Sequence, residues 1–141
     1  MDLFSHAIAG ASVGAAFGNP WLGAFVGITP DLVLGLRRKP SPTQLYNATH
    51  SMLTVVAVGL PFWFIYATPV PLLALLSHLL LDIPTHGKEW APTLLYPLSE
   101  KRYGYGKEWE WFNRSWIIGL CITIIWSAAW FTLARRHMAM I

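Results

Sequence analysis

The chain has 141 residues, enough for one domain, and no linker divides it, so we treat residues 1–141 as a single domain. Hydrophobic residues make up 55% of the chain and charged residues 12%, about half the share in an average globular protein. This composition predicts an integral membrane protein in a lipid bilayer; the alternative is a very apolar soluble core protein. The net charge of +3 without a long basic run argues against a nucleic-acid partner, and the single Cys121 excludes a cysteine metal site or a disulfide framework.

Residues 1–36 have the pattern of a helical hairpin. Gly18, Asn19 and Pro20 form the break, because glycine closes a helix, asparagine caps the next one and proline suits its first turn. The residues 29–30, Thr-Pro, are expected to interrupt the second helix just before Asp31. Glycines recur at four-residue spacing, which predicts a groove of bare backbone for close helix packing, within one chain or between chains: Gly10, Gly14, Gly18, Gly23 and Gly27.

A second hairpin is expected between His50 and Gly87, with arms at 51–67 and 71–83 and Pro84 ending the second arm. Residues 88–115 are polar, aromatic and loop-like. Residues 116–134 carry no charge and extend roughly 28 Å as a helix, close to the thickness of a bilayer core. The predicted fold is therefore all-α, a polytopic membrane helical bundle of about five helices: two hairpins plus a C-terminal span.

The charges suggest an orientation for this bundle. If both hairpins cross and return, the N-terminus, residues 37–39 and the loop at 88–115 share one side, which holds eight of the ten Lys and Arg residues. By the positive-inside rule this side is cytoplasmic, although Arg135 and Arg136 then lie on the other side. We expect a multi-pass protein of a bacterial inner (cytoplasmic) membrane whose functional side faces the cytoplasm.

Six imidazole and carboxylate side chains fall at the same end of this predicted bundle. They lie at helix starts, at helix ends or directly after a helix: His6, Asp31, His50, His78, Asp82 and His86. His78 and Asp82 are four residues apart and so project from one face of one helix, roughly 6 Å apart. Imidazole nitrogen and carboxylate oxygen are ligands that zinc accepts where no thiolate is present, so the pattern predicts a divalent metal site, most simply zinc.

Each of these residues also has a purely structural explanation. His6 can start a helix at an interface, His50 can neighbour a cap, and Asp31 can compensate a helix dipole. His78 and Asp82 can form a structural hydrogen-bonded pair, and His86 can belong to a turn. All these explanations would have to hold together, which favours the metal site. His137, in the tail, is expected to be a solvated bystander.

Several short motifs resemble the bacterial family of inner-membrane metal-dependent hydrolases over roughly the first 102 residues. The matching stretches are Ser5-His6 with Gly10, Pro30-Asp31, Thr49-His50-Ser51, residues 77–82 (Ser-His-Leu-Leu-Leu-Asp), Thr85, Gly87, Tyr96-Pro97 and Arg102.

The order of the ligands is also similar to that of the zinc-dependent phospholipase C and P1 nuclease group, whose members are all-helical. This resemblance implies one zinc held by Asp31, His50, His78 and Asp82, with His6 and a bridging Asp82 around a second. The further histidine and the His-x-x-x-Glu pair of that group are missing here; only His86 follows, and Glu89 could substitute. We therefore expect one or two ions and no third.

These features together suggest a membrane-bound metal-dependent hydrolase of an ester or phosphoester, with a phospholipid head group as the simplest substrate. Asp31 or Asp82 would orient or deprotonate the attacking water. Basic residues lie where a lipid phosphate would bind: Arg37, Arg38, Lys39, Lys88 and Arg102. The alternatives are a non-catalytic, metal-stabilised membrane factor that binds a partner protein and a haem-binding bundle that uses paired histidines.

Overall fold

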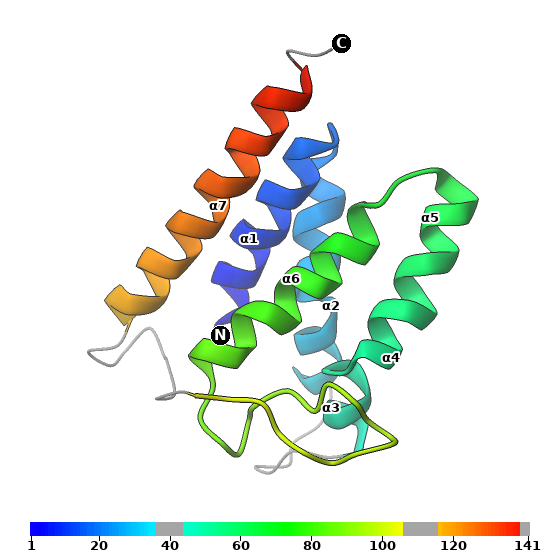
Figure 1. Ribbon diagram of the computed structural model, residues 1–141, viewed down its shortest axis with the longest axis vertical. Coiled ribbons are helices and arrows are strands. Elements are labelled where there is room, and N and C mark those ends of the chain that lie inside the picture. Colours follow the sequence, from blue (N-terminus) through cyan, green and yellow to red (C-terminus); the bar gives the residue numbers. More distant parts are fainter. Residues whose placement is uncertain (36–43, 106–115, 139–141) are drawn as a thin grey trace.

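The computed structural model describes residues 1–35, 44–105 and 116–138 and is built from helices, with no strand in these ranges (Figure 1). The predicted all-α fold is confirmed. The elements in chain order are α1 (Leu3–Ala16), α2 (Pro20–Gly35), α3 (Gln44–Thr49), α4 (Met52–Thr54), the π-helix η1 (Val55–Gly59), α5 (Leu60–Tyr66), α6 (Val70–Thr85) and α7 (Trp116–Met138).

The first hairpin, α1 and α2, forms where the sequence predicts it. Asp2 caps α1 by accepting a hydrogen bond from the Ser5 amide at 3.0 Å, and Gly18 takes the positive φ of 75° that the turn requires. The two helices approach through bare backbone: a Cβ added at Gly23 would lie 2.8 Å from the Gly14 Cα. Four of the five predicted glycines, Gly10, Gly14, Gly23 and Gly27, therefore form the packing surface between α1 and α2, whereas Gly18 lies in the turn, where an added Cβ would meet nothing within 4 Å.

The second hairpin pairs the continuous helical run α4–η1–α5 with α6, across a turn at Ala67 with a left-handed φ of 49°. The two predictions based on interior prolines were wrong. Pro30 lies inside α2 and Pro84 lies inside the last turn of α6, so neither ends its helix. A proline removes a single amide donor, and around Pro84 the helix is held by the His86 amide, which donates to the Asp82 carbonyl at 3.0 Å.

The helices enclose α1, which contacts α2, α6 and α7. Residues 88–105 contain no helix or strand, as predicted for the start of the polar loop; residues 106–115 lie outside the described ranges. This segment is attached to the hairpins by backbone hydrogen bonds. The Met52 amide donates to the Leu94 carbonyl at 2.9 Å, and the Tyr105 amide donates to the Ile83 carbonyl at 3.1 Å.

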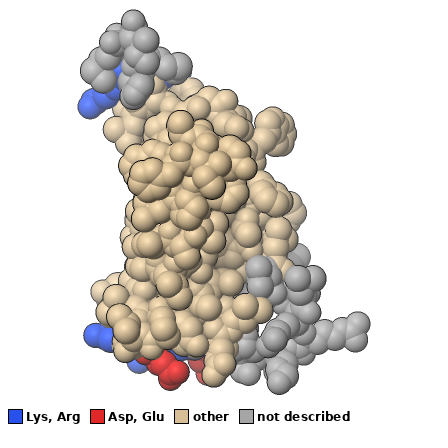
Figure 2. Space-filling model, turned by 90° about the vertical axis from the view of Figure 1, so that its right-hand side faces the viewer, with Lys and Arg blue, Asp and Glu red and all other residues tan. Residues whose placement is uncertain are grey.

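The predicted membrane topology is contradicted. Within the described residues, no helix combines the length and the apolar character needed to cross a bilayer. The helices α1, α2 and α6 have 14, 16 and 16 residues, or roughly 21–24 Å, against a hydrocarbon core of roughly 30 Å. The multi-pass inner-membrane localisation inferred from composition is accordingly wrong. Figure 2 shows charged side chains at the two ends of the molecule, with uncharged residues between them.

Candidate metal centre

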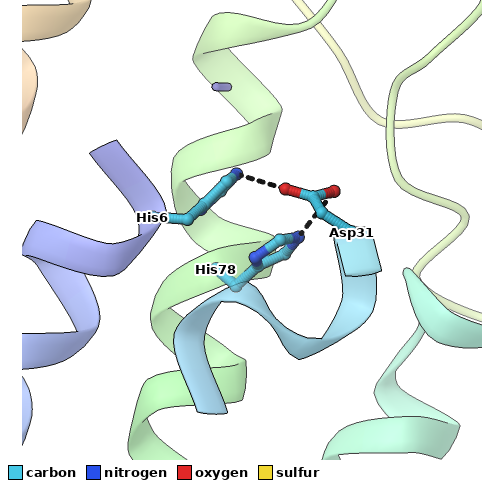
Figure 3. A group of neighbouring side chains, drawn as sticks. All are labelled: His6, Asp31 and His78. Atoms are coloured by element: carbon cyan, nitrogen blue, oxygen red, sulfur yellow. Dashed lines mark ion pairs between the residues drawn. The ribbon is translucent and has the colours of Figure 1, made fainter. Parts of the chain in front are cut away.

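The structure brings all six predicted imidazole and carboxylate residues together at one end of the bundle. They come from α1 (His6), α2 (Asp31), the break after α3 (His50), α6 (His78, Asp82) and the residue that follows α6 (His86). Each of these imidazoles lies within 3.6 Å of an Asp82 oxygen. Figure 3 shows three of the side chains, His6, Asp31 and His78, pointing toward one another from three different helices. Four of the residues are fully buried: His6, His50, His78 and Asp82.

A compact group of four atoms forms the centre of this cluster. The His50 and His78 Nε2 atoms lie 3.2 Å apart. Asp82 Oδ2 is 3.3 Å from His78 Nε2 and 3.6 Å from His50 Nε2. Asp31 Oδ1 is 3.3 Å from His50 Nε2 and 3.8 Å from His78 Nε2. The two imidazole nitrogens and Asp82 Oδ2 therefore lie close enough together to hold one ion, and His6, Asp31 and His78 form a second such group.

The other ring nitrogen of each central histidine fixes its tautomer. His78 Nδ1 donates a hydrogen bond to the Gly27 carbonyl at 2.7 Å, and His50 Nδ1 donates to the Tyr46 carbonyl at 3.2 Å. A carbonyl can only accept, so both Nδ1 atoms carry protons, and in the neutral rings both Nε2 atoms have lone pairs. Two lone pairs that face each other at 3.2 Å repel, and a cation between them, either a proton or a metal ion, removes that repulsion. Such backbone contacts from the outer ring nitrogen are typical of metal-bound histidines.

The distances among His50, His78 and Asp82 fit three ligands of a tetrahedral ion. With zinc–ligand bonds of about 2.0–2.1 Å, the edges of a regular tetrahedron measure about 3.3 Å. The three distances among these ligand atoms are 3.2, 3.3 and 3.6 Å. Asp82 Oδ2 is also a buried oxygen without a hydrogen-bond partner, an arrangement that costs free energy unless the oxygen meets a cation. The side chains present therefore fit a divalent metal.

The second oxygen of Asp82 faces a different set of nitrogens. His6 Nε2 lies 2.9 Å from Asp82 Oδ1, His86 Nε2 lies 3.1 Å from it, and the Met1 amine lies 2.8 Å from it. The Met1 amine also contacts His86 Nε2. This side of Asp82 is already satisfied by nitrogen donors, so the Oδ2 side has the greater need of a cation.

The electrostatics of the metal-free cluster keep His6 and His50 neutral and Asp31 ionised, but favour a proton on His78 that a metal ion would displace. Burial, with the charge of His78 second, lowers the pKa of His6 to about 4 and so keeps that imidazole neutral. Burial also lowers the pKa of His50. Burial alone would raise the pKa of Asp31, but the hydrogen bond from His50 and the charges of His78 and His6 outweigh it and hold the pKa at about 2. For His78, burial opposes protonation, but the charge of Asp82 outweighs it and raises the pKa.

Sequence reasoning missed the residues that hold His50. The Tyr46 ring stacks on the His50 ring with centroids 3.9 Å apart, and the Tyr46 hydroxyl donates to the Trp90 carbonyl. Next to it, the Arg102 guanidinium donates to the Asn47 Oδ1 at 3.0 Å and to the Ala91 carbonyl at 3.1 Å. The segment at 88–105 thus supports the short helix that ends at His50. The one available signal was the aromatic residue four positions before the histidine, on the same helical face.

The predicted phosphate-binding residues, unlike the predicted metal ligands, do not form a cluster within the described residues. The Arg102 guanidinium is engaged with backbone and amide oxygens, and Lys88 is exposed beside the exposed Glu89. Arg37, Arg38 and Lys39 lie outside the described residues. Their phosphate-binding role, and the substitution of Glu89 for a missing ligand, stay predictions.

The comparisons with known proteins give no further guide to this cluster. No family model, curated protein or solved structure matches the chain. The resemblance to metal-dependent hydrolases stays a prediction, and the functional argument rests on the geometry of the site.

Proposed function

We propose that this protein is a metal-dependent hydrolase of an ester or phosphoester, with a zinc ion held by His50, His78 and Asp82. One observation carries the proposal: two histidine Nε2 atoms face each other at 3.2 Å, with both Nδ1 protons bound to carbonyls, beside a buried Asp82 oxygen that lacks a partner. Two imidazoles and one carboxylate, with a fourth position open, are a common ligand set of catalytic zinc.

Asp31 differs from these three ligands in its exposure. Its side chain is 20% accessible, whereas those of His50, His78 and Asp82 are accessible to 1% or less. The open side of the cluster is therefore the Asp31 side, where a substrate can approach. When bound, a divalent ion supplies Lewis-acid polarisation of an ester oxygen and a strong nucleophile at neutral pH.

The chemistry of Asp31 follows from its charge and position. A carboxyl group with a pKa of about 2 is ionised at neutral pH and is a weak base. Asp31 therefore orients the attacking water by accepting a hydrogen bond from it. His6 Nε2 lies 3.8 Å from Asp31 Oδ2, beyond hydrogen-bond distance, and belongs to a neutral ring, so it does not neutralise the Asp31 carboxylate.

A second function is favoured by a separate feature of the same site. Asp31 Oδ1 lies 3.3 Å from His50 Nε2 and 3.8 Å from His78 Nε2, so Asp31 can serve as a fourth ligand, and zinc enclosed by four protein ligands is typical of structural sites. In that case the ion holds the helices together, and the protein is a non-catalytic factor that binds a partner protein. The two functions differ in whether Asp31 is needed for metal binding or only for turnover.

Two conservative variants separate these functions. The full chain is purified with zinc, the zinc content is measured by mass spectrometry, and turnover is measured on bis(p-nitrophenyl) phosphate and p-nitrophenyl acetate. Asp82→Asn should lose both the zinc and the activity. Asp31→Asn should retain the zinc and lose roughly 10²–10⁴-fold in kcat, the usual contribution of a group that acts on the water proton.

Asp2→Asn is the matched control, because asparagine caps a helix as well as aspartate does and Asp2 only caps α1. It should retain both the zinc and the activity. If Asp31→Asn loses zinc as completely as Asp82→Asn, and wild-type protein turns over neither ester, the hydrolase proposal is wrong and the structural site is favoured.

A further inference from the structure

A second feature next to the metal centre has no role in binding the ion: an apolar cavity of about 360 Å³ between α2, the run α4–η1–α5 and α6. It begins beside the site, because two of its lining residues, Pro30 and Thr49, directly precede Asp31 and His50 in the chain. The cavity and the open side of the metal centre are therefore neighbours.

The cavity extends away from the ion along α6. Its lining includes Pro71 and Leu75, which precede His78 by seven and three residues on that helix. At about 1.5 Å per residue, Pro71 lies roughly 10 Å from the level of His78. The residues that line the cavity on α6 therefore extend from the turn before His78 along the helix, away from the metal centre.

The walls of the cavity offer little to a polar ligand. Its three threonines each donate their single hydroxyl proton to a backbone carbonyl: Thr29 to Phe25, Thr49 to Tyr46 and Thr54 to Ala48, at 2.9, 3.1 and 2.7 Å. Most of the other lining residues are aliphatic or aromatic side chains. No charged residue lines the cavity, so an apolar group is the occupant that suits it.

Two further observations indicate that the cavity is open for entry, although Leu75 of the packed core forms part of its lining. Phe25, Val58 and Phe62, which also line it, are exposed at 62%, 42% and 40%. Val58 belongs to the π-helix η1, and π turns inside helices occur frequently at functional sites. A ligand can therefore enter past these exposed side chains and contact the core at Leu75.

We propose that this cavity binds the apolar chain of the ester cleaved at the metal centre, so that the substrate is an amphiphile: a phosphate or carboxylate ester joined to a single alkyl or acyl chain. This inference rests on the proposed hydrolase function for the position of the ester. A methylene group occupies about as much space as a water molecule, roughly 30 Å³, so the cavity accepts a chain on the order of ten carbons. Each methylene added up to that length should tighten binding about fourfold, which corresponds to about 0.8 kcal/mol.

The test uses non-cleavable n-alkyl phosphonates of two, four, eight and twelve carbons, bound to the zinc-loaded full chain and measured by calorimetry below their micelle concentrations. Affinity should rise steeply to about ten carbons and then level off. Val58→Trp fills the cavity and should weaken binding of the eight-carbon ligand at least tenfold while leaving the two-carbon ligand unchanged. The matched control is Val56→Trp, an exposed position in the same π turn that does not line the cavity, and it should leave all affinities unchanged.

Phe62→Ala provides an independent check if Val58→Trp does not fold, because it enlarges the cavity and should move the plateau to longer chains. An affinity that does not depend on chain length, or an equal loss in Val56→Trp and Val58→Trp, would overturn the cavity assignment. Turnover of p-nitrophenyl esters with chains of the same lengths separates the two proposals. Binding that depends on chain length, without any turnover, supports the cavity assignment and contradicts the hydrolase proposal. Turnover of short and long esters with equal KM supports the hydrolase proposal and contradicts the cavity assignment.

Discussion

The contact between α1 and α2 provides a sharp test of the fold, through the variant Gly23→Ala. An ideal Cβ at this position would lie 2.8 Å from both the Cα and the amide nitrogen of Gly14, where ordinary contacts are 3.4–4 Å. The carbonyl oxygen of Gly10 would lie closer still. All three neighbours are backbone atoms, so relief requires one helix to move by well over half an ångström. Overpacking of this kind costs about 1–3 kcal/mol.

The same substitution has a favourable component. Alanine stabilises a helix interior by about 1 kcal/mol relative to glycine. With three backbone clashes, the overpacking cost lies at the upper end of its range, so the net loss in Gly23→Ala should be about 2 kcal/mol. For a chain of this size, that loss lowers Tm by about 3–8 °C. Thermal unfolding followed by circular dichroism measures it. Ala15→Gly, at an exposed position in the last full turn of α1, isolates the helix-propensity contribution.

A packing explanation requires Gly23→Ala to be less stable than the wild type. If the variant melts at the same temperature or higher, the close backbone approach between α1 and α2 does not exist in solution. The position of His6 relative to Asp31 would then need another explanation, because these two residues belong to the two helices of this hairpin.

Three further predictions concern the metal centre. At a free zinc concentration a thousand times Kd, bound zinc should stabilise the fold by about 4 kcal/mol, so chelation should lower Tm correspondingly. Equal melting curves with and without chelator would exclude a zinc site that stabilises the fold. In metal-free protein, the pKa of His6 falls from 6.5 on folding to about 4, so the unfolded chain binds the extra proton between these values. The free energy of unfolding should therefore fall by about 3 kcal/mol as the pH drops from 6.5 to 4, because His6 stays neutral in the folded protein. Urea unfolding of His6→Gln should show a weaker dependence of this free energy on pH over the same window. Arg102→Met removes the donor to Asn47 and should weaken zinc binding about 10–100-fold in competition with a chromogenic chelator, whereas the exposed Lys101→Met should have no effect.

The sequence predicted the hairpins and the gathering of the site because both depend on local signals. Residues 18–20 and 67–71 break helices through glycine and proline chemistry, and helix starts and ends then place the histidines and aspartates at one end. Pro30 and Pro84 misled the prediction because each removes only one amide donor, and the helix continues across it.

Other features depend on contacts between distant segments and leave no local pattern. The π turn at 55–59 and the engagement of Arg102 by Asn47, 55 positions away, are examples. The membrane prediction failed for a different reason. It was drawn from overall composition and from the uncharged stretch at 116–134, but within the described residues no helix, the 23-residue α7 included, combines the length and the apolar character that a span needs.

The turn at Ala67 has a practical consequence, because it separates the ligands into two groups. Asp31 and His50 precede it, while His78 and Asp82 follow it. A protein divided at this turn would carry an incomplete set of donors on each piece, and neither piece alone could bind zinc tightly. Zinc uptake by a mixture of the two pieces would therefore report their reassociation, with the ion serving as the link between separately produced halves.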